Sequence, residues 1–149
     1  MKARRMIRSF IWVVVVVACL FLSSVAQASD YLGQFCWQSS VDGSIYVFAV
    51  NDMGNFHYLL NGRVILPGGS ILPLSGSAEA GQQGDNTAVY VSLNGGLFGS
   101  SLTESFSLNW ALNLSTLNGT GAGIMIGSNY QGQSTIAVIQ DTLNFVFCP

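Results

Sequence analysis

The chain has 149 residues, the length of a single domain. Four of its five basic residues lie within the first eight positions, so the rest of the chain carries one base, Arg63, against seven acids. A chain with one cation offers no basic surface to phosphate groups, which excludes nucleic acid and anionic membrane surfaces as expected partners.

The first 28 residues have the pattern of a secretory signal peptide. A basic start is followed by the uncharged apolar run 10–22 and then by Ala26-Gln27-Ala28, the order of n-region, h-region and cleavage site. We expect export to remove residues 1–28 and to leave one domain, 29–149, in the periplasm or outside the cell. The apolar run is short for a spanning helix. A lipoprotein, lipidated and anchored through Cys19, is the alternative.

Two cysteines remain after the leader, Cys36 near the start of the domain and Cys148 beside its end. An even pair in an exported chain predicts a disulfide, which would join the first strand to the last. The whole chain has one histidine and no second cysteine pair, so we expect no zinc site or other metal site, and no cofactor.

After the leader, runs rich in β-branched and aromatic residues alternate with turn sequences rich in Gly, Asn and Asp. No run of helical length keeps a period of 3.6 residues. The clearest period of two is Ser105–Leu114, with apolar residues at even positions and mostly polar ones at odd positions. The expected strands are 35–40, 45–50, 56–65, 71–78, 87–93, 105–114, 121–126, 135–140 and 143–147.

These patterns predict an all-β fold, an antiparallel up-and-down meander of eight or nine strands that closes into a small barrel. A β-sandwich is the alternative, because strand count and turn spacing fit both architectures. An outer-membrane barrel is a third interpretation. Most expected strands are shorter than the roughly 9 to 11 residues of a membrane-spanning strand, so we expect no membrane insertion of the mature chain.

The first strand carries Gly33-Gln34-Phe35-Cys36-Trp37. With the meander and the linked ends, it resembles the calycins, the lipocalin and avidin type of barrel, here in a small bacterial exported form. Lipocalins have Gly-x-Trp at this place, whereas this chain has Gly-x-x-x-Trp. The resemblance implies a structural Trp37, with Arg63 as the base that packs across it. It also implies that the barrel interior binds a small molecule.

Catalytic residues are scarce in this sequence. The only histidine, His57, has polar neighbours and no Gly-x-Ser-x-Gly motif accompanies it, so an ordinary surface imidazole is expected. Most acids lie in or beside turns, where hydrogen bonds to the local backbone explain them. Glu79 and Glu104 are the one pair that deserves comparison with a glycosidase pair. We expect a protein that is not an enzyme.

Aromatic side chains are the best candidates for ligand contact. In a calycin-like barrel the even positions of 105–114 point inward, so we expect Trp110 to share the interior with Tyr58 and Tyr90. Because Arg63 is the only base after the leader, the expected ligand is a small neutral apolar or aromatic molecule. The alternative is a secreted interaction or structural module, such as an inhibitor or a surface-assembly component. Ile45–Val50, apolar on both faces, favours it if this strand faces a partner rather than lying in a covered centre. The oligomeric state stays open.

Overall fold

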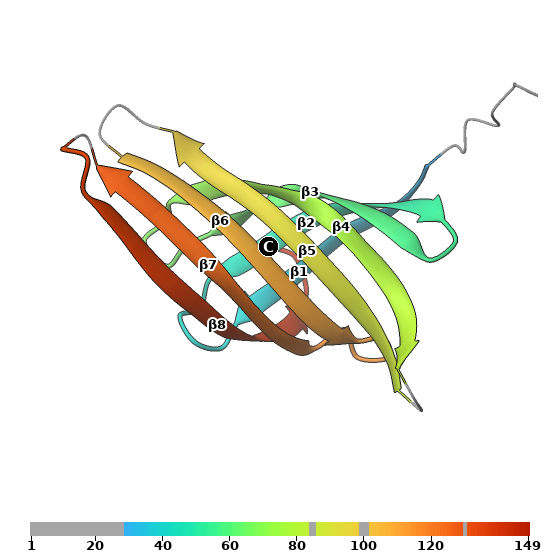
Figure 1. Ribbon diagram of the computed structural model, residues 1–149. Coiled ribbons are helices and arrows are strands. Elements are labelled where there is room, and N and C mark those ends of the chain that lie inside the picture. The colour runs from blue at the N-terminus through green and yellow to red at the C-terminus, as the bar shows by residue number, and fades with distance from the viewer. Residues whose placement is uncertain (1–28, 84–85, 99–101, 130) are drawn as a thin grey trace, which may run out of the picture.

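The protein is a closed antiparallel barrel, in which every strand pairs with its neighbours in the chain and β1 pairs with β8 (Figure 1). The computed structural model describes residues 29–83, 86–98, 102–129 and 131–149. The leader, its cleavage site and Cys19 lie outside these residues. The strands are β1 (Asp30–Ser39), β2 (Ile45–Gly54), β3 (His57–Ile65), β4 (Ile71–Gln83), β5 (Asn86–Phe98), β6 (Leu102–Asn113), β7 (Gly119–Asn129) and β8 (Ser134–Val146).

The predicted meander is confirmed, and its closure excludes the sandwich. The last two expected strands are one continuous strand, β8. The strands have 9 to 13 residues, so the expectation of short strands was wrong, and strand length is no argument against a membrane barrel. Phe56, at the start of the expected strand 56–65, lies instead in the β2–β3 turn with φ 64° and is exposed. In the part of the chain that the structure describes, no helix has the length and apolar character of a membrane span.

Apolar side chains fill the barrel from inside. In β6 the even residues Leu108, Trp110 and Leu112 are buried, whereas Ser107 and Asn109 are exposed, as the period of two predicts. This is the reverse of a lipid-facing barrel, whose apolar band points outward. The core residues are Trp37, Tyr46, Phe48, Val50, Leu60, Val64, Leu72, Leu74, Ala78, Val89, Val91, Leu93, Leu108, Trp110, Leu112 and Leu143.

Four aromatic rings form a layer across the interior, which we call the aromatic layer: Trp37, Tyr46, Phe48 and Trp110. The ring centroid of Trp110 lies 4.8 Å from that of Tyr46, 5.8 Å from that of Trp37 and 6.0 Å from that of Phe48. These distances are typical of attractive aromatic pairs. The layer therefore divides the interior into two halves.

Glycines on the inner face of β7 make room for this layer. A Cβ atom on Gly121 would lie 2.5 Å from Cδ1 of Trp110, and one on Gly123 would lie 2.6 Å from Cδ2 of Leu108. Both distances are shorter than ordinary packing allows. The absence of a side chain at these two glycines therefore leaves room for Trp110 and Leu108 of β6 inside the barrel.

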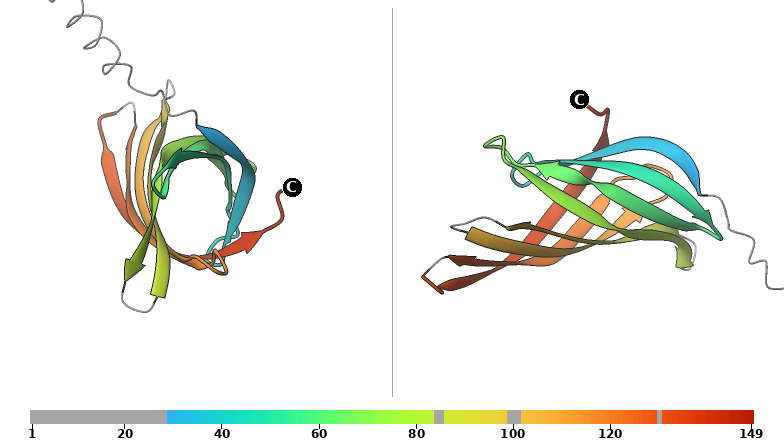
Figure 2. Two further views of the ribbon diagram at one scale, coloured as in Figure 1. Left: turned by 90° about the vertical axis from the view of Figure 1, so that its right-hand side faces the viewer. Right: turned by 90° about the horizontal axis from the view of Figure 1, so that it is seen from above.

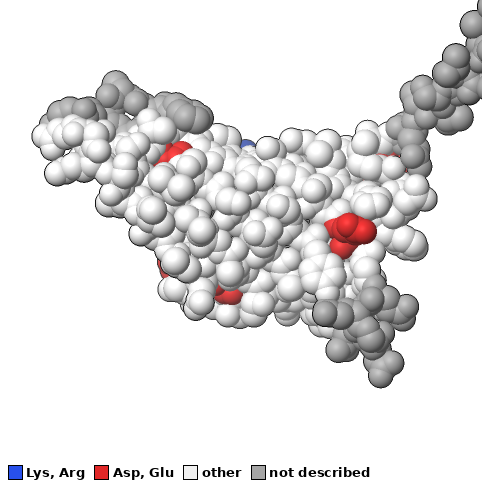
Figure 3. Space-filling view, viewed as in Figure 1, with Lys and Arg blue, Asp and Glu red and all other residues white. Residues whose placement is uncertain are grey.

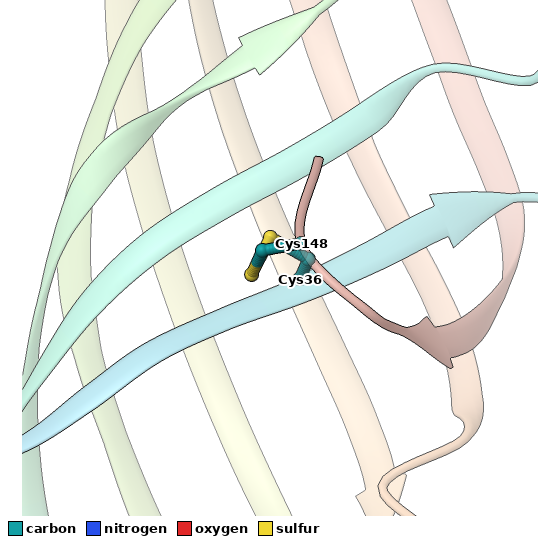
Figure 4. Close-up of a disulfide and its surroundings, with 2 residues drawn as sticks. All are labelled: Cys36 and Cys148. Atoms are coloured by element: carbon teal, nitrogen blue, oxygen red, sulfur yellow. A yellow bond between two sulfur atoms is a disulfide. The ribbon is translucent and has the colours of Figure 1, made fainter.

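The closure between β1 and β8 is short. β1 pairs with β8 only over Cys36–Ser39, against a much longer pairing with β2. The predicted bond between Cys36 and Cys148 is present, with 5.2 Å between the two Cα atoms, and lies just past the end of β8 (Figure 4). The disulfide reinforces the β1–β8 pairing, which is the shortest strand pairing of the barrel.

The disulfide also explains the strand that is apolar on both faces. Val47 points away from the interior, pairs with Cys36, and is nevertheless buried. The C-terminal residues bonded to Cys36 lie over this part of the sheet (Figure 4). Val47 is thus buried beside the disulfide, so the outward side of this strand offers no exposed valine there to a partner.

The barrel has two unlike ends. The end that carries the β1–β2, β3–β4 and β7–β8 turns is called the upper end here, and the end that carries the β2–β3 and β6–β7 turns is the lower end. The strands are strongly staggered, and β5 to β8 extend beyond β1 to β4 at the upper end, which lies at the left in the right-hand view of Figure 2.

Candidate functional site

The interior holds two cavities that share no lining residue. The upper cavity has a volume of about 380 Å³ and lies at the upper end. The lower cup has a volume of about 180 Å³ and lies on the other side of the aromatic layer. Tyr46 lines the upper cavity and Trp37 lines the lower cup, so members of the aromatic layer form a wall of each.

Most of the upper cavity is lined by apolar side chains from both sides of the barrel. They come from the upper parts of β3 and β4, which face β6, β7 and β8 across the opening. Inward positions of successive strands alternate with outward ones, and this brings residues distant in sequence to one surface. The apolar residues are Val41, Val64, Leu66, Leu72, Leu74, Phe106, Leu108, Met125 and Ile139.

One side of the upper cavity is polar. The Asp141 carboxylate accepts a hydrogen bond from Ser39 Oγ at 2.7 Å and one from the Tyr46 hydroxyl at 3.4 Å. Ser39 and Tyr46 are both buried. These bonds fix the carboxylate at the point where β1 and β8 meet, so a charged group is held beside an apolar wall.

All charged side chains that line the upper cavity are acids: Asp42, Glu104 and Asp141. Partial burial opposes ionisation of Asp42, but hydrogen bonds from the backbone and hydroxyl of Ser44 outweigh it and lower the pKa of Asp42 below its ordinary value. Burial, together with the negative charges of Asp141 and Asp42, raises the pKa of Tyr46 far above its ordinary range. Tyr46 therefore stays a neutral hydrogen-bond donor.

The lower cup is apolar and is bordered by the β6–β7 turn. The indole Nε1 of Trp37 donates a hydrogen bond to the carbonyl oxygen of Leu117 at 2.8 Å, which ties this turn across the end of the barrel. Asn118 Oδ1 accepts a further bond from the backbone of Phe145. The lining residues are Leu32, Phe35, Trp37, Val50, Tyr58, Leu60, Ala78, Val89, Val91, Leu112, Leu114 and Leu117.

The three predicted ligand residues do not come together. Trp110 lies in the aromatic layer and lines neither interior cavity. Tyr58 is inside, as expected, and lines the lower cup. Tyr90 is exposed on the outer face, contrary to expectation, because its neighbours Val89 and Val91 take the inward positions of β5. The alternation of β5 was not resolved from sequence.

The position of Arg63 also differs from the one that the calycin resemblance implies. Leu60 and Val64 point inward from β3, so Arg63 lies on the outer face, whereas Trp37 is buried inside. The sheet separates the two residues, and the expected packing of a base across Trp37 is wrong. Trp37 keeps a structural role, through the aromatic layer and its bond to the β6–β7 turn.

A larger hollow of about 730 Å³ crosses the outer face of β5 to β8 and includes Tyr90. Its lining mixes small side chains on the outer side of the barrel, such as Ala111, Thr120 and Ala122, with polar ones such as Asn109 and Gln140. Buried apolar walls are what hold a small ligand. We therefore assign the candidate site to the interior, despite the larger volume outside.

The remaining catalytic candidates are separated. His57 pairs directly with Glu79 across β3 and β4, and both side chains are exposed on the outer face. Glu104 lies inside the upper cavity, so Glu79 and Glu104 are on opposite faces of the sheet and do not form the opposed pair of a glycosidase. Within the described residues, no group of three or more His, Cys, Asp or Glu side chains could hold a metal ion.

Sequence reasoning missed the polar side of the upper cavity. The sequence predicts that most acids, Asp141 among them, lie in or beside turns, but Asp141 lies within β8 and points inward. Glu104 continues the inward alternation of Phe106, Leu108 and Trp110 by one step, and this signal was in the sequence.

No protein-family model matches the chain, and no curated protein is significantly similar to it.

Proposed function

We propose that the protein is a non-enzymatic binding protein, which holds a small molecule with an apolar or aromatic body in the upper cavity. The observation that carries this proposal is a cavity of about 380 Å³ with mainly apolar walls and polar groups on one side. Ligand sites in proteins commonly have volumes of roughly 300 to 1,000 Å³ and this distribution of polarity. The lower cup, at about 180 Å³, is smaller than that range.

The lining groups favour a particular ligand chemistry. An engineered apolar cavity of roughly 150 Å³ holds benzene, so the upper cavity has room for about two fused rings. Its carboxylates accept hydrogen bonds and repel anions. The ligand of this proposal is a neutral apolar or aromatic molecule that ends in a hydrogen-bond donor, such as a hydroxyl or amide group.

Export is part of the same proposal. A disulfide between Cys36 and Cys148 is compatible with an oxidising compartment, because thiols are usually kept reduced in the cytosol. The leader pattern of residues 1–28 supports delivery to the periplasm or the exterior. The closed meander, with a ligand cavity at one end, is also in keeping with a calycin-like carrier.

Calorimetric titration with three naphthalene derivatives tests the proposal at neutral pH. We expect 2-naphthol, which is neutral, to bind to the mature protein, and 2-naphthoate to bind at least about tenfold more weakly because of the carboxylates. Cationic 2-naphthylmethylamine should bind at least as well as 2-naphthol. Absence of binding by all three, or a preference for naphthoate, would overturn the proposal.

Three variants locate the ligand. Met125→Trp places a bulky ring in the upper cavity and should abolish binding of 2-naphthol. Thr120→Trp adds the same ring to an outward position of β7 and is the matched control. Ala78→Leu fills part of the lower cup and should leave binding unchanged. Loss of binding in Ala78→Leu alone would move the site to the lower cup.

A further inference from the structure

The short closure leaves a stretch of β8 without a partner on one side. β1 covers β8 only over Leu143–Val146, and one further backbone bond joins Ser40 N to Thr142 O. Residues Ser134–Gln140 pair with β7 alone. Among the described residues, none contributes a backbone hydrogen bond to Ile136 or Val138 from the β1 side.

The free backbone groups can be assigned by the alternation of an antiparallel strand. The bond to Thr142 shows that even residues of β8 face the β1 side. The bond from Asn129 N to Gln133 O shows that odd residues face β7. The N–H and C=O groups of Ile136 and Val138 therefore point out of the sheet edge, ready to pair with another strand.

Apolar side chains accompany this free edge. Ile136 and Val138 are 72% and 74% exposed on the outer face. Ile126 and Ile124 lie directly opposite them on β7 and are also exposed. The outer face over β5 to β8 shows only isolated acidic groups (Figure 3). We call Ser134–Gln140 with these four apolar residues the β8 edge.

A second free edge in the same molecule is protected, whereas the β8 edge is not. The first half of β1 extends past the end of β8, but it has a register shift between Tyr31 and Gly33, Gly33 has φ +130°, and Asp30 lies at its tip. Bulges and charges are the usual means by which natural sheets prevent edge pairing. Ser134–Gln140 contains no charge, no proline and no glycine.

We propose that the mature protein forms a two-fold homodimer, in which the β8 edges of two copies pair antiparallel around Ala137. This register places Ile136 opposite Val138 of the other copy and Ser134 opposite Gln140. Apolar residues then meet apolar residues, and polar meet polar. The even residues, whose backbone groups are free, become the hydrogen-bonded pairs. This self-complementarity is the reason to favour a second copy over a different partner.

The pairing removes two unfavourable features at once. The free N–H and C=O groups gain partners, and the four apolar side chains of each copy join into one strip on the outer face. Both copies are acidic, but the paired segments are uncharged, so like charges do not meet in the strand pair. Ile139 and Gln140 of the β8 edge also line the upper cavity, so the dimer would form directly beside that cavity.

Analytical ultracentrifugation of the mature chain over a concentration series tests the dimer. We expect a reversible monomer–dimer equilibrium. Val138→Lys should weaken it at least about tenfold, because a lysine would be buried against apolar residues of the other copy. Ile71→Lys, a substitution at an exposed apolar residue of β4, is the matched control and should leave the dimer intact. A chain that stays monomeric, or a dimer that survives Val138→Lys, would overturn the proposal.

Cross-linking tests the register independently of stability. Ala137 would lie opposite Ala137 of the other copy in a pair without hydrogen bonds, where Cα atoms are about 4.5 Å apart and a disulfide fits. Ala137→Cys should therefore give a covalent dimer on mild oxidation, and Thr135→Cys, which faces Ile139 of the other copy, should not. Equal cross-linking of both variants, or open-ended filaments instead of dimers, would contradict the two-fold pairing.

Discussion

The upper cavity and the lower cup are built by the same alternation of inward side chains, yet they differ in polarity. The lower cup has apolar walls, and a turn borders it, tied by the bond from Trp37 to Leu117. The upper cavity has three carboxylates and lies beside the extended ends of β5 to β8 (Figure 2). An apolar space without oriented polar groups mainly stabilises a fold, whereas one with oriented polar groups can also select a ligand.

The difference between the two ends depends on the aromatic layer between them. An eight-stranded barrel has an interior just wide enough for side chains to fill, so a few large rings suffice to divide it. Trp110 contacts rings that belong to both cavities, Tyr46 above and Trp37 below. The predictions that follow remove or disturb the features that keep the two ends distinct.

The largest effect is expected from removal of the dividing ring. Trp110→Ala should lower the free energy of unfolding by about 3 to 5 kcal/mol, because it empties a buried site and joins the two cavities. Urea unfolding measures this loss. Trp110→Phe, which retains a ring in the layer, is the control and should lose clearly less. A loss of equal size in both variants would show that the ring does not act as a partition.

The disulfide should matter more for the lower cup than for the upper cavity. Cys148→Ser should cost about 2 to 5 kcal/mol of stability. Because Phe35 and Trp37 of β1 line the lower cup, hydrogen exchange should increase in β1 and in the β6–β7 turn that Trp37 holds. β3 and β4, which line the upper cavity, should change little. Uniform loss of protection over all strands would contradict this difference between the two ends.

A smaller loss is expected where β7 leaves room for the layer. Gly121→Ala would place a methyl group 2.5 Å from Trp110 Cδ1 and should cost about 1 to 3 kcal/mol through overpacking. Gly68→Ala, in the β3–β4 turn, has open space around it and should be close to neutral. Chemical denaturation compares the two variants. Unchanged near-ultraviolet circular dichroism in Gly121→Ala would show that Trp110 does not need the space.

The sequence predicted the architecture better than the candidate site. Strand order, closure and the disulfide followed from turn spacing, residue type and two isolated cysteines. The inward face of β6 was clear because polar and apolar residues alternate from Ser105 to Leu114 with Ala111 as the one exception. In β5, Tyr90 follows Val89 and precedes Val91, so large side chains occupy both faces and its direction was not readable.

The polar side of the upper cavity depends on register, which a single sequence does not contain. Asp141 meets Ser39 and Tyr46 only because β8 pairs with β1 at one particular offset. A shift by one residue would turn Asp141 outward. The glycines of β7 carried a signal that was overlooked, since Gly119, Gly121 and Gly123 alternate with the same period as the side chains of β6 that cover them.

The last prediction concerns the response of the upper end to alkaline pH. Burial, the charges of Asp141 and Asp42, and the hydrogen bond to Asp141 raise the pKa of Tyr46 in the folded state above its value of about 10 in the unfolded chain. Below about pH 10 the hydroxyl is neutral in both states, and this contribution to stability is complete. Above it, only the unfolded chain loses the proton, so stability should fall as pH rises towards the folded pKa.

Tyr46→Phe should cost about 1 kcal/mol at neutral pH, through loss of one hydrogen bond, but should lessen the alkaline loss. Urea unfolding between pH 7 and pH 11, with Tyr31→Phe as the control at an exposed tyrosine, measures both effects. Parallel alkaline profiles for the wild type and Tyr46→Phe would mean that the hydroxyl beside Asp141 does not govern the response of the upper end to alkaline pH.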